Sequence, residues 1–194
     1  KVLHGVNFQV RRGEIVLLLG RNGAGKTTSL AAITGLVPKL SGSVKFEGKD
    51  ITKSSPFDIC NAGISHVLEG HRIFGDLSVE DNLRLGGFGM MRGEALNKRL
   101  QYIYELFPLM REHRLKKAGR LSGGQQQILA VAQGLVSNPK LLFLDEPSIG
   151  VAPLIVSEIL AMVKQFQKEG MSVLLVEQLV HQALDVADNV YIID

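Results

Sequence analysis

Hydrophobic and polar residues alternate with two different periods along this chain. Near its start, Val6, Phe8 and Val10 alternate with polar residues, which is the period of a half-buried strand. A turn at Gly13-Glu14 then leads into the apolar run 15–19, which is typical of a strand buried on both faces. The pattern predicts that the chain begins inside a sheet.

Further elements follow from changes of period and from turn residues. The sequence next predicts a helix over 27–35 that ends at Gly35 and Pro38, a short strand over 43–46 closed by Gly48, a brief helix over 56–62 and a strand over 63–68. Between 78 and about 119 the strand signals disappear, and apolar residues recur at helical intervals: Leu83, Leu96, Leu100, Ile103, Leu106 and Leu109. We interpret this stretch as an all-helical insertion.

Strand and helix alternate again toward the end of the chain. The predicted elements are a strand over 141–144, a helix over 154–168, a strand over 173–176, a helix over 179–187 and a strand over 190–193. This order predicts a mostly parallel sheet with helices on its faces.

Composition adds bounds to this picture. The 194 residues suit one domain, and 45% hydrophobic residues are typical of a globular chain rather than a disordered one. No apolar run approaches the roughly 18–20 residues that cross a bilayer, so we expect any membrane role to come through a partner. The lone Cys60 cannot form an internal disulfide, which fits a reducing compartment. The net charge is a mild +3, and its densest basic stretch, 111–117, is interpreted as the solvated face of a helical region.

A phosphate-binding loop is predicted between the buried strand and the first helix. This stretch reads Gly20-Arg21-Asn22-Gly23-Ala24-Gly25-Lys26-Thr27-Thr28, which is the complete pattern G-x-x-x-x-G-K-T. Its glycines allow tight turns that point N–H groups inward, and the start of the helix adds partial positive charge. We expect Lys26 to reach the β- and γ-phosphates of a nucleotide, and Thr27 to offer its hydroxyl to magnesium. A plain glycine-rich turn is the alternative.

Two carboxylates end the buried strand that begins at Leu141. The carboxyl ends of strands are where open α/β sheets bind ligands. Asp145 is placed to hold the magnesium ion, directly or through water, and Glu146 is the candidate to orient and deprotonate an attacking water. Taken alone, the two acids could serve only as a loop or a helix cap, but the presence of Lys26 in the same chain favours catalysis.

The stretch Leu121-Ser122-Gly123-Gly124-Gln125 precedes a helix that is predicted to run to about Ser137. Ser122 and Gln125 have the spacing of a capping box, which is a purely structural interpretation. Two glycines at a helix start also expose backbone N–H groups to an anion. A capping box alone would not select glycine twice.

These motifs together resemble the ATP-binding subunit of an ABC transporter. GRNGAGKTT, LSGGQ and LLFLDEPS occur in the family's order and approximate spacing, and the resemblance covers essentially the whole chain. It implies a P-loop NTPase core with a mostly parallel sheet, a small antiparallel N-terminal β part and an all-helical insertion. The whole chain 1–194 would be a single domain with a helical subdomain at about 78–120.

The resemblance also implies partners and ligands. The family works as a head-to-tail dimer that binds ATP and Mg²⁺. One domain holds ATP through Lys26 and Thr27, and its γ-phosphate contacts the partner's copy of Ser122, Gly123, Gly124 and Gln125.

Two departures from the family pattern narrow the resemblance to one branch. Where the family usually has a glutamine that touches magnesium and senses the transmembrane partner, this chain has Glu69, and Gln178 replaces the expected histidine. Together with residues 72–74, 77–83 and 146–153, they resemble the second ATP-binding subunit of bacterial branched-chain amino-acid importers. A related importer of amides or urea is the alternative.

Gln178 changes the expected chemistry. Because its side chain is neutral, more of the transition-state charge must be met by Lys26, magnesium and the opposite Ser122 helix. His181 lies one turn into the next helix and is interpreted as a helix-surface residue. The predicted catalytic residues are Glu146, Lys26 and Gln178, and the predicted magnesium site is formed by Thr27, Asp145 and Glu69.

The expected function is an ATPase subunit that powers uptake of branched-chain or related amino acids at the cytoplasmic face of the cell membrane. Its expected partners are a second ATPase subunit, the same or a related chain, then transmembrane permease subunits and, indirectly, an extracytoplasmic solute-binding protein. Family members usually extend beyond both ends of this chain, and an adenine-stacking aromatic would lie upstream of Lys1, so we interpret the chain as the central part of a longer protein.

Two other classes of protein share the phosphate loop. A DNA-repair or chromosome-organising ATPase generally carries a long coiled-coil insertion, whereas the insertion here is compact, and we expect no nucleic-acid partner. A monomeric phosphate-loop kinase would have no use for LSGGQ.

Overall fold

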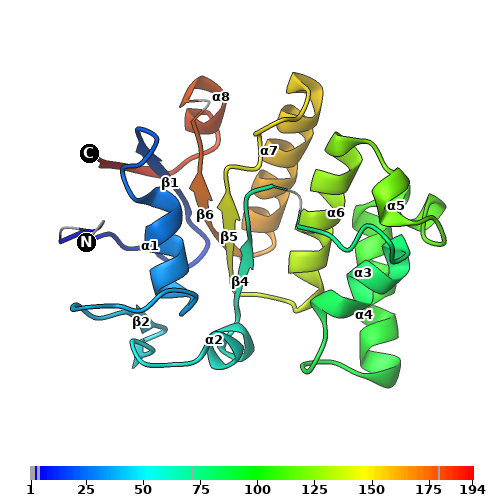
Figure 1. Cartoon of the computed structure of the whole chain (residues 1–194), viewed down its shortest axis with the longest axis horizontal. Coiled ribbons are helices and arrows are strands. Elements are labelled where there is room, and N and C mark those ends of the chain that lie inside the picture. The colour runs from blue at the N-terminus through cyan, green and yellow to red at the C-terminus, as the bar shows by residue number, and fades with distance from the viewer. Residues whose placement is uncertain (1–2, 4, 71, 179) are drawn as a thin grey trace.

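A five-stranded sheet forms the centre of the molecule. The computed structural model describes residues 3, 5–70, 72–178 and 180–194. The strand order is β4-β5-β6-β1-β7, and every pairing is parallel (Figure 1). The strands are β1 (Ile15–Gly20), β4 (Ile64–Val67), β5 (Leu141–Asp145), β6 (Ser172–Val176) and β7 (Asn189–Ile193). The predicted α/β fold with a mostly parallel sheet is therefore confirmed.

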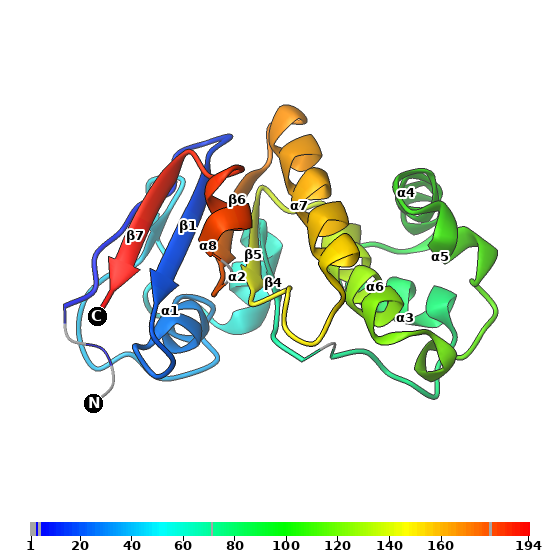
Figure 2. The same ribbon diagram turned by 90° about the horizontal axis from the view of Figure 1, so that it is seen from above.

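The helices lie on both sides of this sheet (Figure 2). They are α1 (Lys26–Ile33), α2 (Pro56–Ala62), α3 (Val79–Gly86), α4 (Gly93–Leu106), α5 (Pro108–Glu112), the short 3₁₀ helix η1 (Ala118–Arg120), α6 (Gly123–Val136), α7 (Pro153–Lys168) and α8 (Val180–Leu184). None of the helices in the described part of the chain is long and apolar enough to span a bilayer.

The two faces of the sheet bury alternate residues of each strand, because successive side chains point in opposite directions. On β1, Ile15 and Leu17 belong to a hydrophobic cluster with residues of α6 and α7. Val16 and Leu18 belong to a second cluster, with Leu30 of α1 and Ile59 of α2. Burial on both faces explains why the strand reads as a continuous apolar run.

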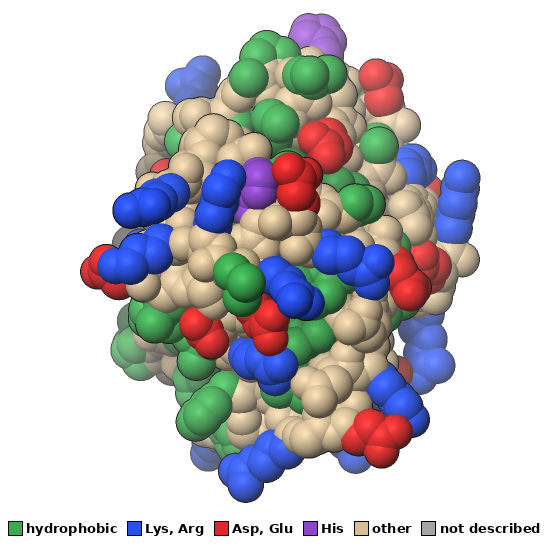
Figure 3. Space-filling view, turned by 90° about the vertical axis from the view of Figure 1, so that its right-hand side faces the viewer, with side chains coloured by type: hydrophobic (Ala, Val, Ile, Leu, Met, Phe, Trp, Pro, Cys, Tyr) green, Lys and Arg blue, Asp and Glu red, His purple; other side chains and the backbone are tan. Residues whose placement is uncertain are grey.

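The segment from 78 to 120 contains helices and one isolated bridge between Ser78 and Lys117. Its helices α3 and α4 pack on α6 at one end of the molecule (Figure 1). The approach of α3 is close, because a Cβ on Gly86 would lie 2.1 Å from the Gln133 carbonyl oxygen. The basic stretch 111–117 is largely exposed here, as predicted, and basic and acidic side chains are interspersed on this side of the molecule (Figure 3).

The predicted strand over 6–10 is wrong. These residues form no strand with any described part of the chain, although Val6, Phe8 and Val10 are half-buried and their neighbours exposed, as the alternation predicted. Phe8 packs instead against the ring of Tyr191, with 5.9 Å between centroids. Alternation reports which side chains face the core, but backbone pairing needs a neighbouring strand in register.

The small antiparallel part is confirmed, but it is a hairpin of β2 (Lys45–Phe46) and β3 (Lys49–Asp50). The predicted strand over 43–46 is thus shorter and has a partner that the sequence did not indicate. Glu47 and Gly48 connect the strands with φ angles of 49° and 80°. Two left-handed residues are typical of a type I′ hairpin turn.

The predicted helix over 179–187 is also too long. Leu179 lies outside the described residues, and α8 ends at Leu184. The chain then returns to the sheet, where the Asp188 N–H donates to the Ile15 carbonyl and the Asp188 carboxylate accepts from the Ile15 N–H, both at 2.8 Å. These bonds hold the residues before β7 against β1, so the helix cannot continue.

Candidate active site

The loop between β1 and α1 has the backbone of an anion-binding turn. Gly23 and Gly25 have φ angles of 85° and 101°, and the Ala24 N–H donates to the Arg21 carbonyl. Gly25 caps α1 without a side-chain hydrogen bond. The first N–H groups of a helix have no partner within the helix, so those of α1 are available to a phosphate.

Gly20 has a second reason to be glycine. A Cβ at this position would lie 2.4 Å from the Ile193 carbonyl oxygen of β7 and 3.2 Å from the Ala24 Cβ. Its lack of a side chain therefore lets β7 pack beside the start of the loop.

Lys26 is buried and points back into its own loop. Its ammonium donates to the Gly20 and Arg21 carbonyls at 2.9 and 3.3 Å and lies 3.3 Å from the Glu146 carboxylate. The loop carbonyls and Glu146 are therefore the present partners of the ammonium that we expect to bind phosphate.

Thr27 and Asp145 meet, as predicted, at the end of β5. The Thr27 hydroxyl donates to Asp145 Oδ1 at 3.1 Å. Asp145 Oδ2 is buried and has no hydrogen-bond partner among the described residues. The pKa of Asp145 is raised to about 6, mainly by burial; the Thr27 hydrogen bond and the charge of Lys26 oppose this shift, and the charges of Glu146 and Glu69 add to it.

These oxygen atoms fit magnesium. Mg²⁺ prefers oxygen ligands and is usually held by one or two protein groups together with phosphates and water. The described residues contain no cluster of three His, Cys, Asp or Glu side chains that could hold a metal ion by themselves. Glu69 is exposed on the turn after β4, and its charge acts on Asp145.

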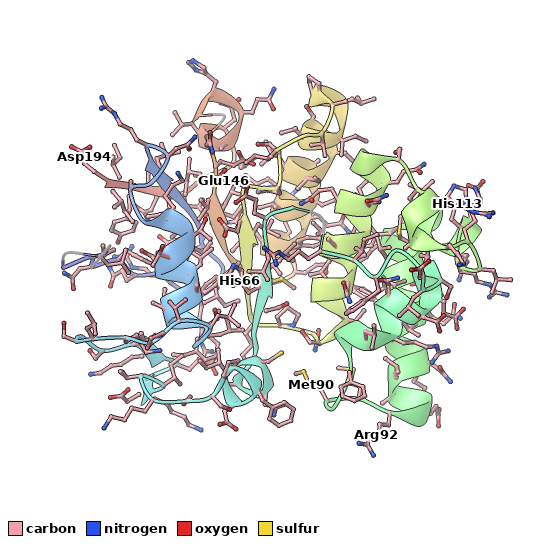
Figure 4. All side chains as sticks on the ribbon, viewed as in Figure 1. His66, Met90, Arg92, His113, Glu146 and Asp194 are labelled. Atoms are coloured by element: carbon pink, nitrogen blue, oxygen red, sulfur yellow. The ribbon has the colours of Figure 1, made fainter. Side chains whose placement is uncertain are left out.

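Glu146 and Gln178 also lie together. The Gln178 side-chain amide donates to the Glu146 carboxylate at 2.5 Å. Glu146 has a left-handed backbone with φ of 49°, and its N–H donates to the Val176 carbonyl at 2.9 Å. Figure 4 shows Glu146 directly after the end of β5. Non-glycine residues in this conformation are uncommon and cluster at functional sites.

Sequence reasoning missed Glu177, which is buried behind this pair. Its carboxylate accepts from the Ser148 N–H at 3.0 Å, from the Ser148 hydroxyl at 2.6 Å and from the Gln178 N–H at 3.0 Å. It thereby ties the chain after Glu146 to the chain after β6. The available signal was an acid directly after the apolar run 173–176.

The predicted capping box at the start of α6 is present. The Ser122 hydroxyl accepts from the Gln125 N–H at 3.3 Å, and the Gln125 side chain accepts from the Ser122 N–H at 3.0 Å. The two glycines differ, because a Cβ on Gly124 would lie 2.8 Å from Ile155 whereas one on Gly123 would meet nothing within 4 Å. Figures 1 and 2 place the start of α6 away from the start of α1, with β4 and β5 between them.

Several known proteins are similar to this chain in sequence. Residues 3–149 match the family described as "ABC transporter". The chain is 42% identical to the high-affinity branched-chain amino acid transport ATP-binding protein BraG of Pseudomonas aeruginosa, over all of this chain and 83% of that protein. It is 33% identical to a probable branched-chain amino acid transport ATP-binding protein, LivF, of Archaeoglobus fulgidus, over 99% of this chain and 81% of that one.

Solved structures of ATP-binding cassettes have a similar fold. An ATP-binding cassette of an ABC transporter in its ADP conformation superposes with a TM-score of 0.89 at 30% identity, covering 99% of this chain and 81% of that one. A cassette described as a dimeric post-hydrolysis state bound to ADP and Pi has a TM-score of 0.87 at 25% identity, covering all of this chain and 86% of that one. The resemblance inferred from the motifs is confirmed: this chain belongs to the ABC transporter family, as an ATP-binding domain of the kind that hydrolyses ATP.

Proposed function

We propose that this chain powers the import of branched-chain or related amino acids through separate membrane subunits. The observation that carries the catalytic part is the convergence of residues from three elements: Lys26 and Thr27 of α1, Asp145 and Glu146 at the end of β5, and Gln178 after β6. The identity to BraG over the whole chain supports the class of transported solute.

The proposed reaction is an in-line attack of water on the γ-phosphate of ATP. Glu146 orients and deprotonates the water, and Gln178 orients Glu146 through the hydrogen bond between them. Lys26 and the loop N–H groups neutralise phosphate charge, and Thr27 and Asp145 hold the magnesium ion, with Glu69 nearby. Mg²⁺, when bound, offsets the charge that develops on the phosphate oxygens.

Lys26 has to change partners for this reaction. In the present conformation its ammonium is bound by Glu146 and two loop carbonyls. Phosphate oxygens would replace them, because the phosphates of a nucleotide carry several negative charges, whereas the two carbonyls are neutral and Glu146 carries one. Glu146 would then be released to water.

A second ATPase domain completes the proposed site. The start of α6 lies apart from this chain's own loop (Figure 2), so Ser122, Gly123, Gly124 and Gln125 would reach the γ-phosphate of a partner's ATP. Ser122 and Gly123 are exposed, as such a contact requires. The related cassette described as a dimer supports this arrangement.

The remaining partners follow from the same proposal. We take the segment 78–120 as a helical subdomain that moves with the turn 69–76 when ATP closes the dimer, and these parts would push on transmembrane permease subunits. The domain would act at the cytoplasmic face of the cell membrane, indirectly with an extracytoplasmic solute-binding protein.

Sedimentation of the Glu146→Gln variant with and without ATP tests the proposal. Slowed hydrolysis should trap a dimer that forms only with ATP and Mg²⁺, and a Ser122→Arg change in the same chain should prevent it. A monomer under all conditions would contradict the shared site and point to a phosphate-loop enzyme that works alone. If the ATP-dependent dimer forms, co-purification would identify the neighbouring membrane and solute-binding subunits, and through them the transported solute.

A further inference from the structure

Two buried polar atoms without a hydrogen-bond partner face each other beside the active site. They are His66 Nε2, on β4, and Asp145 Oδ2, at the end of the neighbouring strand β5, and no described residue bonds to either. They lie 3.9 Å apart, and the two side chains are 6% and 0% exposed. An unpartnered buried polar atom is costly, so a matched pair at this distance indicates a bond that forms in another state of the site.

The ring of His66 is held on its other side. β4 and β5 pair so that His66 lies opposite Phe143, and the two rings are in edge contact with centroids 5.9 Å apart. His66 Nδ1 lies 3.4 Å from the hydroxyl of Thr34, and Thr34 is the C-cap of α1. The imidazole is therefore held between α1 and β5. Figure 4 shows His66 below Glu146.

These polar groups follow one another along one helix, with the 3.9 Å gap between His66 and Asp145 as the only step that is not a contact at hydrogen-bond distance. Thr27, in the first turn of α1, donates to Asp145 Oδ1, Asp145 Oδ2 faces His66, and His66 contacts Thr34 at the far end of α1. The helix that carries the phosphate loop is thus attached at both ends to the strands that carry Asp145 and His66. His66 is the link between the two attachments.

The chemistry of the pair selects one tautomer. A neutral imidazole has one N–H, and if it were on Nδ1, the lone pair of Nε2 would face the lone pairs of the Asp145 carboxylate in a buried site. A proton on Nε2 instead gives Asp145 a donor. Nδ1 then accepts from the Thr34 hydroxyl, which now donates to the Leu30 carbonyl at 2.9 Å and would turn to the ring.

We propose that His66 is a positioning residue of the magnesium site: its Nε2–H donates to Asp145 Oδ2 and so holds Oδ1 toward the metal. The inference rests on the proposed function, in which Asp145 and Thr27 hold the magnesium of ATP. The 3.9 Å between His66 Nε2 and Asp145 Oδ2 would close when the Thr27 oxygen turns from Asp145 to the metal, because the Asp145 carboxylate is then free to rotate toward His66. Outer partners of this kind fix the orientation of metal-binding carboxylates, and their loss typically costs about 10–100-fold in metal affinity.

Three substitutions separate this role from simple packing. His66→Gln keeps a donor near the position of Nε2, His66→Asn keeps a polar group only near Nδ1, and His66→Leu keeps neither. Each is made in the Glu146→Gln background, where ATP remains intact. The measurements are the affinity for Mn²⁺ in the presence of ATP, by electron paramagnetic resonance, and the affinity for ATP in EDTA.

We expect His66→Gln to hold Mn²⁺ as the parent does, and His66→Asn and His66→Leu to hold it at least about tenfold more weakly, with metal-free ATP affinity unchanged in all four chains. Equal Mn²⁺ affinity in the parent and His66→Leu, with ATP binding intact, would overturn the role of His66 alone. Loss of ATP binding in the parent itself would overturn the proposed function and this inference with it.

A second measurement needs no substitution of His66. Long-range ¹H–¹⁵N spectra of the chain with ATP and Mg²⁺ should show the His66 ring as the Nε2–H tautomer. An Nδ1–H ring in that complex would refute the proposal, and this result decides the question if His66→Leu fails to fold.

Discussion

The Lys26 ammonium lies 3.3 Å from the Glu146 carboxylate, and both side chains are buried. The lysine needed for phosphate and the glutamate needed for water are thus each other's partners in this conformation. Pairing offsets part of the cost of burying each charge. Phosphate has to replace Glu146 at Lys26, and the same exchange makes Glu146 available as a base.

Glu146→Gln should therefore abolish turnover while ATP still binds. Removing a general base typically costs about 10²–10⁴-fold in rate, and the neutral amide also relieves repulsion of the γ-phosphate. Gln178→Ala should cost about tenfold or less, because Gln178 acts on Glu146 through one hydrogen bond. Phosphate release by the assembled transporter measures both rates.

A matched control for the second variant is Gln182→Ala, at an exposed glutamine of α8. We expect it to turn over ATP as the parent does. If Gln178→Ala stopped hydrolysis as completely as Glu146→Gln, the ranking of the two residues would be wrong, and Gln178 would have to contact the reacting phosphate itself.

Local signals in the sequence were enough to predict some elements residue by residue. The helix predicted over 56–62 has those bounds in the structure, because Ser55 caps it, Pro56 opens it and Gly63 ends it in a left-handed conformation. The strand predicted over 6–10 failed, because its pattern specified burial but nothing nearby specified a partner strand.

The residues of the candidate site also fall into two groups: those that the sequence could predict and those that it could not. Lys26, Thr27, Asp145, Glu146 and Gln178 could be predicted because recurring motifs mark them, and the structure brings them together. Other contributions depend on contacts between segments far apart in the chain, which no local pattern reports. These are the Ser148 contacts of Glu177, the approach of His66 to Asp145 and the approach of Gly20 to Ile193.

The two glycines before α6 should respond differently to alanine. Gly124→Ala should destabilise the fold by about 1–3 kcal/mol, because the new Cβ would lie 2.8 Å from Ile155. Gly123→Ala should leave stability within about 1 kcal/mol of the parent, because nothing lies within 4 Å. Urea unfolding measures both changes, and Ile155→Ala should restore much of the stability of Gly124→Ala.

The same pair tests the shared nucleotide site. In the Glu146→Gln background, Gly123→Ala should weaken ATP-dependent dimerisation even though its stability is unchanged, because the open space at Gly123 is where a partner's phosphate is proposed to lie. A Gly123→Ala chain that dimerised with ATP as its parent does would contradict that placement.

Asn82→Ala should loosen the turn that follows β4. Asn82 is fully buried; its side chain accepts from the Phe74 N–H at 2.8 Å and donates to the Phe74 and Ser78 carbonyls at 3.0 and 2.9 Å. Removing it takes away three partly buried hydrogen bonds to the backbone, which should cost about 2–3 kcal/mol. Thermal unfolding checks the loss, and Asn97→Ala, at an exposed position of α4, should stay within about 0.5 kcal/mol of the parent.

The pH dependence of stability should reveal opposite contributions from His66 and Asp145. Burial lowers the pKa of His66 from 6.5 to about 4, so its contribution is present above pH 6.5 and is lost as the pH falls through 4. The pKa of Asp145 is raised from 3.8 to about 6, so its contribution is present below pH 3.8 and is lost as the pH rises through 6. Each shift corresponds to about 3 kcal/mol, and in the parent chain the two largely cancel.

Single substitutions should uncover each contribution in the absence of metal and nucleotide. As the pH falls from 6.5 to 4, Asp145→Asn should lose stability relative to the parent, because only the unfavourable protonation of His66 remains. His66→Gln should gain stability relative to the parent over the same window, because only the favourable protonation of Asp145 remains. Urea unfolding at several pH values gives the difference between each variant and the parent, which removes the groups common to both. Differences that stayed constant with pH would show that burial holds neither side chain in its neutral form. Slopes of opposite sign would identify His66 and Asp145 as the two opposed titrating groups.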